Sequence, residues 1–215
     1  MTTTKKSAMN KVNNYSDHFK KYNLGCGTQL YKDFLNIGHW ESLEQGGLYK
    51  DLNGTSGTFM LNHDLRNGIP ADDSSLDLVY HAHMLEHLSY IDGINFIKEC
   101  YRVLKSNGRM RILVPDLELW INAYSSKNRF FFEEYRKVLD KNIYVTNASI
   151  FMGMLHNHEH KCGYDFESLS WVVERAGFKN ILRTLYADST IENIKEIEPQ
   201  IPLRVMETLC IECIK

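Results

Sequence analysis

The sequence predicts an α/β fold in which a mainly parallel sheet carries helices on both of its faces. Short apolar runs typical of buried strands alternate with helical or loop connections along most of the 215 residues, as they do in parallel sheets. A glycine turn, Gly25-Cys26-Gly27, directly follows the first of these runs. An amphipathic segment over residues 90–105 leads into another apolar run, as expected where a helix returns the chain to the sheet.

The strands are predicted where short runs of apolar or β-branched residues are bounded by turn residues. In chain order they cover residues 21–24, 34–37, 58–62, 76–80, 110–114, 180–186 and 205–214. The glycines within residues 41–57 predict a loop, and Asn67-Gly68-Ile69-Pro70 predicts a turn.

The first predicted helix covers residues 90–105. Ile94, Ile97 and Tyr101 recur there at spacings of three and four, which is the period of an amphipathic helix. Ser106-Asn107-Gly108 follows, and we expect its glycine to supply a left-handed cap that ends the helix.

The later connections are predicted from composition and capping residues. Residues 117–141 are aromatic and charged and predict one or two helices, whereas residues 142–164 are irregular and rich in histidine. Residues 166–176 predict a helix that begins at the N-cap Asp165 and is closed by Gly177.

Length and charge indicate one domain with an arm and an insertion. The weakly periodic start predicts a flexible N-terminal arm over residues 1–18. A single domain over residues 19–215 follows, and it holds a helical and loop insertion at about 117–164. The 25 Lys and Arg residues against 27 Asp and Glu residues give a formal net charge of −2, which disfavours a nucleic acid as partner. No run approaches the roughly 20 apolar residues of a membrane span.

The cysteines are expected to be reduced thiols. The start MTTTKKSAMN lacks the apolar segment of a secretory signal, so we expect a cytoplasmic protein with free cysteines. Cys210 and Cys213 form a CxxC, but the run LCIECI predicts a strand, in which positions three apart face opposite sides. We therefore expect two unlinked thiols there rather than a redox or zinc site.

The glycine turn is the first candidate binding element, because glycine lets a ligand approach bare backbone closely. No GK[ST] follows it, so it is not a Walker A loop, and Leu30 stands where GxGxxG has its third glycine. We therefore expect a ligand without phosphates, and we exclude a nicotinamide dehydrogenase. Asp64, which follows the third predicted strand, can accept a hydrogen bond from an adenine amino group, although a solvated turn aspartate also fits this pattern.

Six of the nine histidines fall in two short clusters. The first is the set His81, His83, Glu86 and His87, which follows the fourth predicted strand. The carboxyl end of such a strand is a usual position for groups that act on a ligand. Histidine titrates near neutrality, so at least one is a candidate acid–base group, while others can simply cap backbone groups.

The second cluster is His156, His158 and His160, with Cys162 close behind. Alternating histidines beside a thiol are compatible with zinc. Ordinary polar surface and contact with a substrate are equally compatible with the pattern.

The order of several motifs is more specific than any one of them. These motifs are YNLGCG, FLNIG, HDLRNGIPADDSSLDLVYHAHMLEH and ECYRVLKSNGRMRILVPD, followed later by YDFESLSWVVERAGF and METLCIECIK. Together they resemble the class I S-adenosylmethionine-dependent methyltransferases, and within these the type 11 group. That group includes members encoded with bacterial surface-glycan genes. The resemblance spans residues 21–116 and resumes near the end of the chain, and LEH with RVLKSNGRMRI is its most specific part.

The resemblance implies a Rossmann-like sheet of seven strands with the last one antiparallel, and S-adenosyl-L-methionine as the cofactor. By position, the glycine turn lines the methionine and ribose part, Asp64 and Leu65 meet adenine, and the fourth strand ends near the sulfonium. The implied cofactor-binding residues are Gly25, Cys26, Gly27, Gly38, Asp64, Leu65, His81 and Ala82.

One position departs from the family pattern. Such enzymes usually place an acidic residue after the second strand to bind the ribose hydroxyls, and this sequence has Gly38 there. Ribose binding then comes from Glu41 or His39, or it is weak. Gly38 is therefore the best argument for the alternative function, a non-catalytic methyltransferase-like binding or scaffold protein.

Methyl transfer requires a nucleophile in line with the methyl group and the exclusion of water. For a hydroxyl acceptor, His83 or His87 is the expected base, with Glu86 orienting it. Alternatively, Glu86 and His87 ligate a divalent ion that acidifies the hydroxyl. One carboxylate and one imidazole are a thin ligand set, so we expect no metal.

The acceptor is expected to be a small molecule. His160-Lys161 and Tyr164-Asp165 match a pattern of the glycan-associated members, so the resemblance implies that His160 and Tyr164 bind the acceptor. We expect O-methylation of a small polar acceptor, such as a sugar or nucleotide-sugar hydroxyl in surface polysaccharide biosynthesis. A homodimer is a further expectation.

Overall fold

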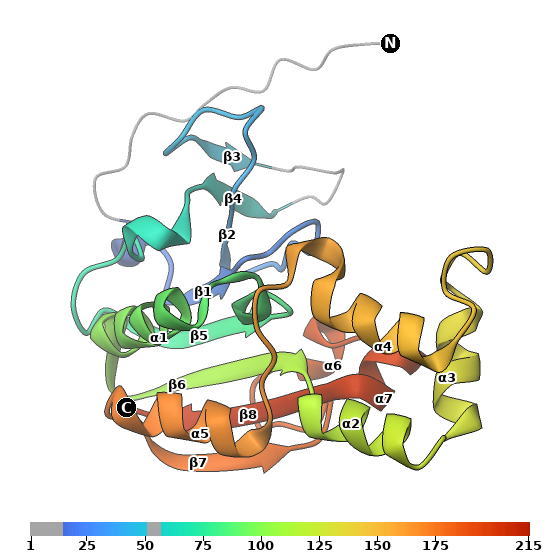
Figure 1. The fold of residues 1–215 in the computed structure, drawn as a ribbon. Helices are drawn as coiled ribbons and strands as arrows, with labels where there is room; N and C mark the ends of the chain where they lie inside the picture. The colour runs from blue at the N-terminus through green and yellow to red at the C-terminus, as the bar shows by residue number, and fades with distance from the viewer. Residues whose placement is uncertain (1–14, 51–56) are drawn as a thin grey trace.

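A computed structural model describes residues 15–50 and 57–215, and an eight-stranded sheet runs through this part of the chain (Figure 1). The strands are β1 (Lys21–Leu24), β2 (Leu35–Gly38), β3 (Leu48–Lys50), β4 (Phe59–Asn62), β5 (Leu76–Ala82), β6 (Leu104–Pro115), β7 (Lys179–Thr184) and β8 (Thr208–Ile214). The helices are α1 (Tyr90–Val103), α2 (Leu117–Ser125), α3 (Arg129–Arg136), α4 (Asn147–His156), α5 (Phe166–Arg175), α6 (Ile194–Ile197) and α7 (Pro202–Glu207).

The strand order is β3-β4-β2-β1-β5-β6-β8-β7. Neighbours from β4 to β6 are parallel, and β8 runs antiparallel to both β6 and β7. The predicted α/β class is therefore confirmed, but the sheet has eight strands rather than seven. The extra strand, β3, is antiparallel to β4, so β8 is not the only antiparallel strand.

Strand β3 lies inside the stretch 41–57 that was predicted as a loop. Its Leu48 and Tyr49 are buried and its Lys50 is exposed. Three residues between glycines are too short to show a period, so burial against β4 rather than local sequence defines this edge strand.

The direction of chain travel across the sheet reverses at β1, which lies between β2 and β5. In open α/β sheets, ligands bind beyond the carboxyl ends of the strands at such a switch point. The segments to inspect are therefore those that directly follow β1, β2, β4 and β5.

Helices cover both faces of the sheet, as predicted. Successive side chains of β5 alternate between the faces, so Val79 packs in the cluster with α1 and α5, whereas Tyr80 packs in the cluster with α6. Cys213 and Cys210 also lie in these two different clusters, and all five cysteines are free thiols. The interpretation of the CxxC as two unlinked thiols is therefore confirmed.

The predicted helices α1 and α5 are observed, with one correction. Asp165 caps α5, and Gly177 after it has a φ of 109°. After α1, however, β6 begins directly at Leu104, and the left-handed residue is Asn107 rather than Gly108. An asparagine tolerates this conformation because its side chain is short and polar.

The insertion at 117–164 is more helical than predicted. Helices α2 and α3 fill residues 117–141 as expected, but α4 lies in the stretch predicted to be irregular. These helices share an apolar cluster around the buried Trp120, which packs edge-on to Phe131 at 4.7 Å between ring centroids. The sequence of α4 is apolar on nearly all sides, so it lacks a clear helical period.

The two ends of the described chain also differ from the predictions. The arm was predicted over residues 1–18, of which residues 1–14 lie outside the described residues. Tyr15–Asp17 forms a short 3-10 helix with Ser16 buried. The strand predicted from residue 205 begins only at Thr208, because the chain first forms α7.

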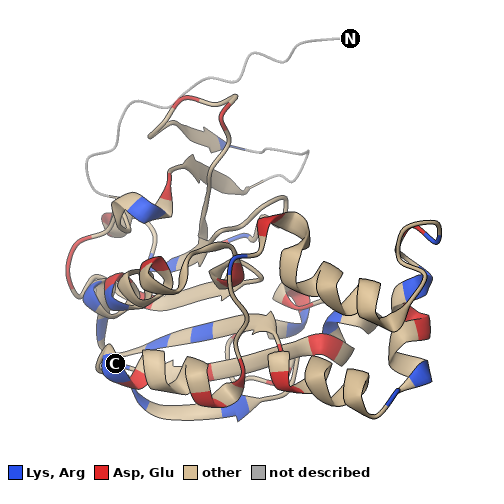
Figure 2. Cartoon of the chain, viewed as in Figure 1, with Lys and Arg blue, Asp and Glu red and all other residues tan. Residues whose placement is uncertain are grey.

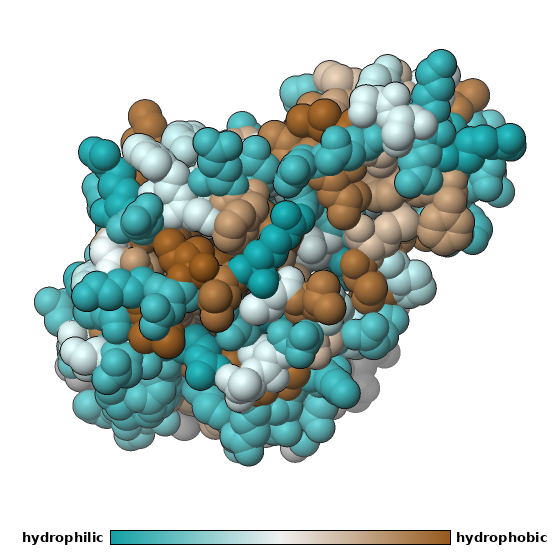
Figure 3. All heavy atoms as spheres, turned by 90° about the horizontal axis from the view of Figure 1, so that it is seen from below, coloured by the Kyte–Doolittle hydropathy of each residue, from teal (hydrophilic) through white to brown (hydrophobic). Residues whose placement is uncertain are grey.

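The surface of the described residues is mixed in charge and in hydropathy. Lys and Arg are interspersed with Asp and Glu along the ribbon (Figure 2). Seen from below, hydrophobic side chains reach the surface in separate patches among hydrophilic ones (Figure 3). None of the helices in the described ranges combines the length and apolar character required to cross a membrane.

Candidate active site

The glycine turn after β1 lines a cavity at the switch point. Gly25 and Gly27 have φ values of 69° and 48°, a region that glycine enters without strain. Between them, the backbone N–H of Cys26 donates to the carbonyl of Ile37 at 2.9 Å and so ties the turn to β2. The cavity has a volume of about 210 Å³, and its walls include the turn and Ala82. The turn and Ala82 therefore lie together, as predicted.

A side chain from the end of β5 closes one side of this turn. A Cβ atom at Gly25 would lie 2.0 Å from Cγ of Met84, so only glycine fits without moving that methionine. Met84 therefore packs directly on the backbone that a ligand would approach.

Gly38 occupies the end of β2, and its Cα faces the ring of Trp40. A Cβ atom there would lie 2.4 Å from that ring. His39 and Glu41, the alternative ribose-binding candidates, are exposed, and Gln45 Nε2 lies 2.6 Å from His39 Nδ1. The fold brings Gly38, His39 and Glu41 near the switch point, but the small cavity is not lined by them.

Asp64 follows β4, as predicted, but its carboxylate already has partners. It accepts hydrogen bonds from the backbone N–H of Arg66 and from the Arg66 guanidinium, with Nη2 at 2.6 Å from Oδ2. These bonds hold the pKa of Asp64 at about 2. Leu65 begins the short 3-10 helix that Asp64 caps. Adenine contact through Asp64 therefore requires the exposed Arg66 side chain to move aside.

His81 does not face the cavity. Its ring is completely buried on the α1 side of the sheet, 5.2 Å from the ring of Phe96. Burial lowers the pKa of His81 to about 4, against a smaller opposing effect of Glu86. Because neighbouring residues of a strand face opposite sides, Ala82 lines the cavity and the imidazole of His81 does not. The His81 side chain is therefore not part of the cavity wall, and its implied place near the cofactor remains a prediction.

His83 is held by partners at both ring nitrogens. Its backbone is left-handed, with a φ of 49°, which is unusual for a residue other than glycine. Nη1 of Arg204 lies 2.6 Å from Nδ1, and Oγ1 of Thr208 lies 3.2 Å from Nε2. Arg204 can only donate, so we assign Nδ1 as the acceptor and Nε2 as the protonated nitrogen.

A second, larger cavity of about 510 Å³ adjoins the first. Its walls come from the end of β5, the insertion helices and α7, and they include His87, His160 and Trp120. His83 and Arg204 line both cavities. The two cavities therefore meet at this pair of side chains.

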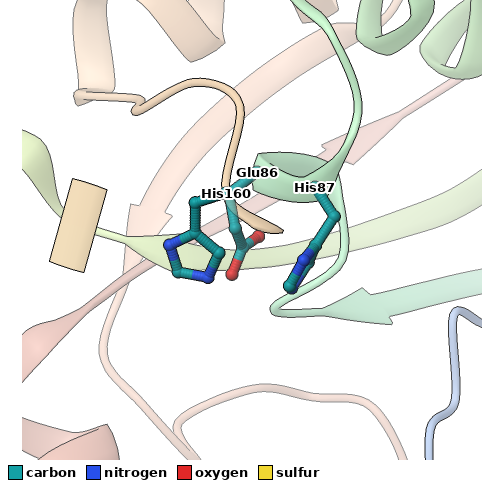
Figure 4. Close-up of side chains that lie close together, drawn as sticks. All are labelled: Glu86, His87 and His160. Carbon is teal, nitrogen blue, oxygen red and sulfur yellow. The ribbon is translucent and has the colours of Figure 1, made fainter. Parts of the chain in front are cut away.

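Glu86, His87 and His160 converge on the wall of the larger cavity (Figure 4). Their nearest ligand atoms all lie within 4.8 Å of one another, and Figure 4 shows the carboxylate between the two imidazoles. The backbone N–H of Lys161 donates to the carbonyl of Glu86 at 2.8 Å, which fixes the His160 loop against the 3-10 helix Leu85–His87. The sequence placed Glu86 and His87 together, but it did not predict that His160 would join them.

Glu86 is a buried acidic side chain. Only 1% of its surface is exposed. Burial by itself raises the pKa of Glu86, but the neighbouring His83 and His87 lower it, and its pKa lies below the usual value. The carboxylate is therefore shielded from solvent and lies close to two imidazoles.

Tyr164 does not reach either cavity. It is 1% exposed, stacks on Tyr90 and contacts α1 near Gly93. Tyr164 therefore lines neither cavity, and its implied contact with an acceptor remains a prediction. The same loop leaves His156 and His158 exposed, with only His158 lining the larger cavity.

Some residues of the site were not predicted from the sequence. Arg204 and Glu207 of α7 line the larger cavity, and Tyr135 of α3 donates a hydrogen bond to Glu207. Glu207 falls within the strand predicted over residues 205–214 and Arg204 lies just before it, so nothing local marked either residue as part of the site. Trp120 was visible as an apolar helix residue, but its place in the cavity wall depends on how α2 packs.

Part of the chain matches a known protein family. Residues 44–112 match the family Methyltransf_11, described as "Methyltransferase domain". This match runs from β3 into β6 and does not include the glycine turn. The search of curated proteins returns no match.

Solved structures share the fold at low identity. A SAM-dependent methyltransferase from Archaeoglobus fulgidus is 18% identical, covers 94% of this chain and 88% of its own, and has a TM-score of 0.51. A Thermotoga maritima protein described as "SAM-dependent methyltransferase, possible histamine N-methyltransferase" is 19% identical, with coverage of 91% and 82% and a TM-score of 0.53. At these identities the likeness shows the fold alone. Together with the match of residues 44–112, this likeness supports S-adenosylmethionine as the cofactor, and the described part of the chain has a Rossmann-like sheet.

Proposed function

We propose that this protein transfers a methyl group from S-adenosylmethionine to a hydroxyl of a small polar acceptor. The observation that carries the proposal is the meeting of two cavities at His83 and Arg204. One cavity has the glycine turn at the switch point, which suits the cofactor, and the other is large enough for a small acceptor. A methyl group transferred between them passes this boundary.

The walls of the larger cavity favour a polar acceptor with an apolar face, such as a sugar. Trp120 and Tyr135 supply aromatic surface, and the indole N–H of Trp120 has no hydrogen-bond partner among the described residues. Aromatic faces with a few convergent polar groups are typical of small-ligand sites. We include the sugar and nucleotide-sugar acceptors of surface polysaccharide biosynthesis in the proposal on the basis of this chemistry and the sequence resemblance.

The group proposed to activate the hydroxyl is the cluster Glu86, His87 and His160. The sequence offered His83 or His87 as the base, but both ring nitrogens of His83 already have partners. His83 is better suited to hold Arg204 at the boundary between the cavities. His87 lies on the wall of the larger cavity beside Glu86, and its ring contacts that of His160.

We predict that His87→Ala lowers turnover by roughly 10²-fold or more while cofactor binding is retained, because the cluster loses a group that acts on the acceptor. The measurement is a screen of sugars, nucleotide sugars and small hydroxylated metabolites, read by a mass shift of one methyl group. His156→Ala, at an exposed position in the same histidine-rich segment, is the matched control. Normal turnover by His87→Ala would show that the role of the cluster is misassigned.

The alternative is a non-catalytic binding or scaffold protein. The cavity at the glycine turn, about 210 Å³, is smaller than the roughly 300 Å³ at the low end for small-molecule sites. Met84 and Trp40 also pack on Gly25 and Gly38. The enzyme proposal requires these side chains to move when the cofactor binds, whereas a scaffold does not.

Two further expectations belong to the proposal. The five free cysteines favour a reducing location such as the cytoplasm. The second expectation is a homodimer, and light scattering on the purified protein measures its oligomeric state directly.

A further inference from the structure

The carboxylate of Glu86 is buried without a hydrogen-bond donor. Both of its oxygens are inaccessible and neither accepts a hydrogen bond within the described part of the chain. The nearest candidate is His83 Nδ1, 3.4 Å from Oε1. That nitrogen accepts from Arg204, so it has no hydrogen to donate. A buried carboxylate whose two oxygens have no partner is costly, and a cation held beside it would supply the missing partner.

His160 is oriented as metal-ligating histidines usually are. Its Nδ1 lies 2.6 Å from the carbonyl oxygen of Met154. A carbonyl can only accept, so Nδ1 carries the proton and Nε2 keeps its lone pair. A hydrogen bond from the far ring nitrogen to a backbone carbonyl is the common means of fixing the tautomer of a metal ligand.

The third member, His87, comes from the same short 3-10 helix as Glu86. Its ring lies 4.7 Å from that of His160 and nearly perpendicular to it. Cys162, the thiol that the sequence offered as a ligand, instead donates to the carbonyl of Leu88 and is not in the cluster. The cluster is therefore two imidazoles and one carboxylate.

The separation of the ligand atoms is close to that of a metal site. In a tetrahedral site with bonds of about 2.1 Å, neighbouring ligand atoms lie about 3.4 Å apart. The atoms here lie within 4.8 Å of one another, so rotations of the two half-buried imidazoles bring them into range.

We propose that Glu86, His87 and His160 bind a first-row divalent transition-metal ion on the wall of the larger cavity. Imidazole ligands favour ions such as Zn²⁺ or Co²⁺ over Mg²⁺ or Ca²⁺. Three protein ligands leave a position open to the cavity, as in catalytic rather than structural sites. The sequence favoured a site without metal because it showed only two ligands, and the fold supplies the third.

The role of the ion rests on the proposed function. The acceptor oxygen binds at the open position, where the ion lowers the pKa of the hydroxyl and its proton leaves to water. The oxygen then forms a bond to the methyl carbon, the carbon–sulfur bond breaks, and its electron pair stays on sulfur as S-adenosylhomocysteine. The ion undergoes no change of oxidation state.

Calorimetric titration of the chelator-treated protein with CoCl₂ and with ZnCl₂ tests the site without any acceptor. We expect one ion per chain for the wild type. His160→Gln and Glu86→Gln should weaken binding by at least the roughly 10–100-fold that loss of even an outer-shell partner causes. His156→Gln, an exposed histidine in the same segment, should bind as the wild type does.

Two outcomes overturn the metal site: no saturable binding by folded wild type, or equal binding by folded His160→Gln and wild type. Thermal unfolding of each variant shows that it is folded.

The methylation screen separates this proposal from the proposed function. Methylation by a protein that binds no ion leaves the function standing and rejects the site. An ion bound without methylation of any acceptor retains the site and counts against the function.

Discussion

The histidines that follow β5 illustrate how one short segment gives side chains three different environments. His81 is in the core, His83 is fixed by Arg204 and Thr208, and His87 faces the larger cavity. The alternation of the strand separates His81 from the cavity. The left-handed backbone of His83 then turns the chain into the 3-10 helix that presents Glu86 and His87.

Burial of His81 predicts a pH dependence of stability. Its pKa is about 4 in the folded state against an ordinary value of 6.5, so the unfolded chain binds the proton more readily. The stability contribution is therefore fully present above pH 6.5 and declines as the pH falls toward 4, by about 3 kcal/mol in total.

The measurement is the free energy of unfolding by urea across this pH range. His81→Leu should lose stability less steeply than the wild type as the pH falls, because the proton-binding difference is removed. His39→Leu, at an exposed position, controls for loss of an imidazole as such. Parallel curves for wild type and His81→Leu would contradict the assignment of His81 as a buried neutral histidine.

At the scale of elements, local patterns predicted most strands and the two helices with clear caps. The strands β1, β2, β4 and β5 are short apolar runs with turn residues beyond them, so their signals are local. Helix α4 and strand β3 were not predicted because they are stabilised by packing against α2 and β4. The local sequence does not indicate these contacts between distant segments.

The candidate site was predictable only in part, for the same reason. Groups that follow one strand, such as Glu86 and His87, can be located by their place at its carboxyl end. His160 lies more than 70 residues later, and the backbone hydrogen bond from Lys161 to Glu86 that positions it has no sequence signature. Arg204 reaches His83 through a helix that the sequence did not indicate.

The capping box of α5 gives a prediction at this scale. The carboxylate of Asp165 accepts from the backbone N–H of Ser168 at 2.8 Å, and Ser168 Oγ accepts from the backbone N–H of Asp165. Asp165→Ala should lower the free energy of unfolding by about 1–2 kcal/mol. Urea denaturation measures this loss. Asp165→Asn keeps a hydrogen-bond acceptor at the N-cap and should recover most of the lost stability. Equal losses of stability in Asp165→Ala and Asp165→Asn would argue against the cap.

At the scale of the whole molecule, a buried ion pair joins the sheet to the segment that covers the glycine turn. Arg111 of β6 and Glu198 after α6 are completely buried, with Nε 2.5 Å from Oε1. Glu198 also accepts from the backbone N–H of Ala187. Nearby, the hydroxyl of Tyr31 donates to the carbonyl of Ile197, which lines the cavity beside the turn. The covering segment is therefore held in place by polar contacts to β6 and to the connection between β1 and β2.

Removing one partner of this pair should be strongly destabilising. Glu198→Ala leaves the buried guanidinium of Arg111 with Glu212 as its one acidic partner among the described residues, so we expect a loss of about 3–5 kcal/mol in the free energy of unfolding. The double variant Arg111→Met/Glu198→Leu removes both charges and should be more stable than Glu198→Ala alone. Thermal and urea unfolding measure both, and a double variant no more stable than the single one would show that packing dominates this site.

Binding of S-adenosylmethionine at the switch point beside the glycine turn is measured by calorimetric titration of the full chain with this compound. We expect saturable binding of one molecule per chain, with Met84 and Trp40 moving to admit it. Absence of any binding at millimolar S-adenosylmethionine would rule out this cofactor site and favour the non-catalytic alternative.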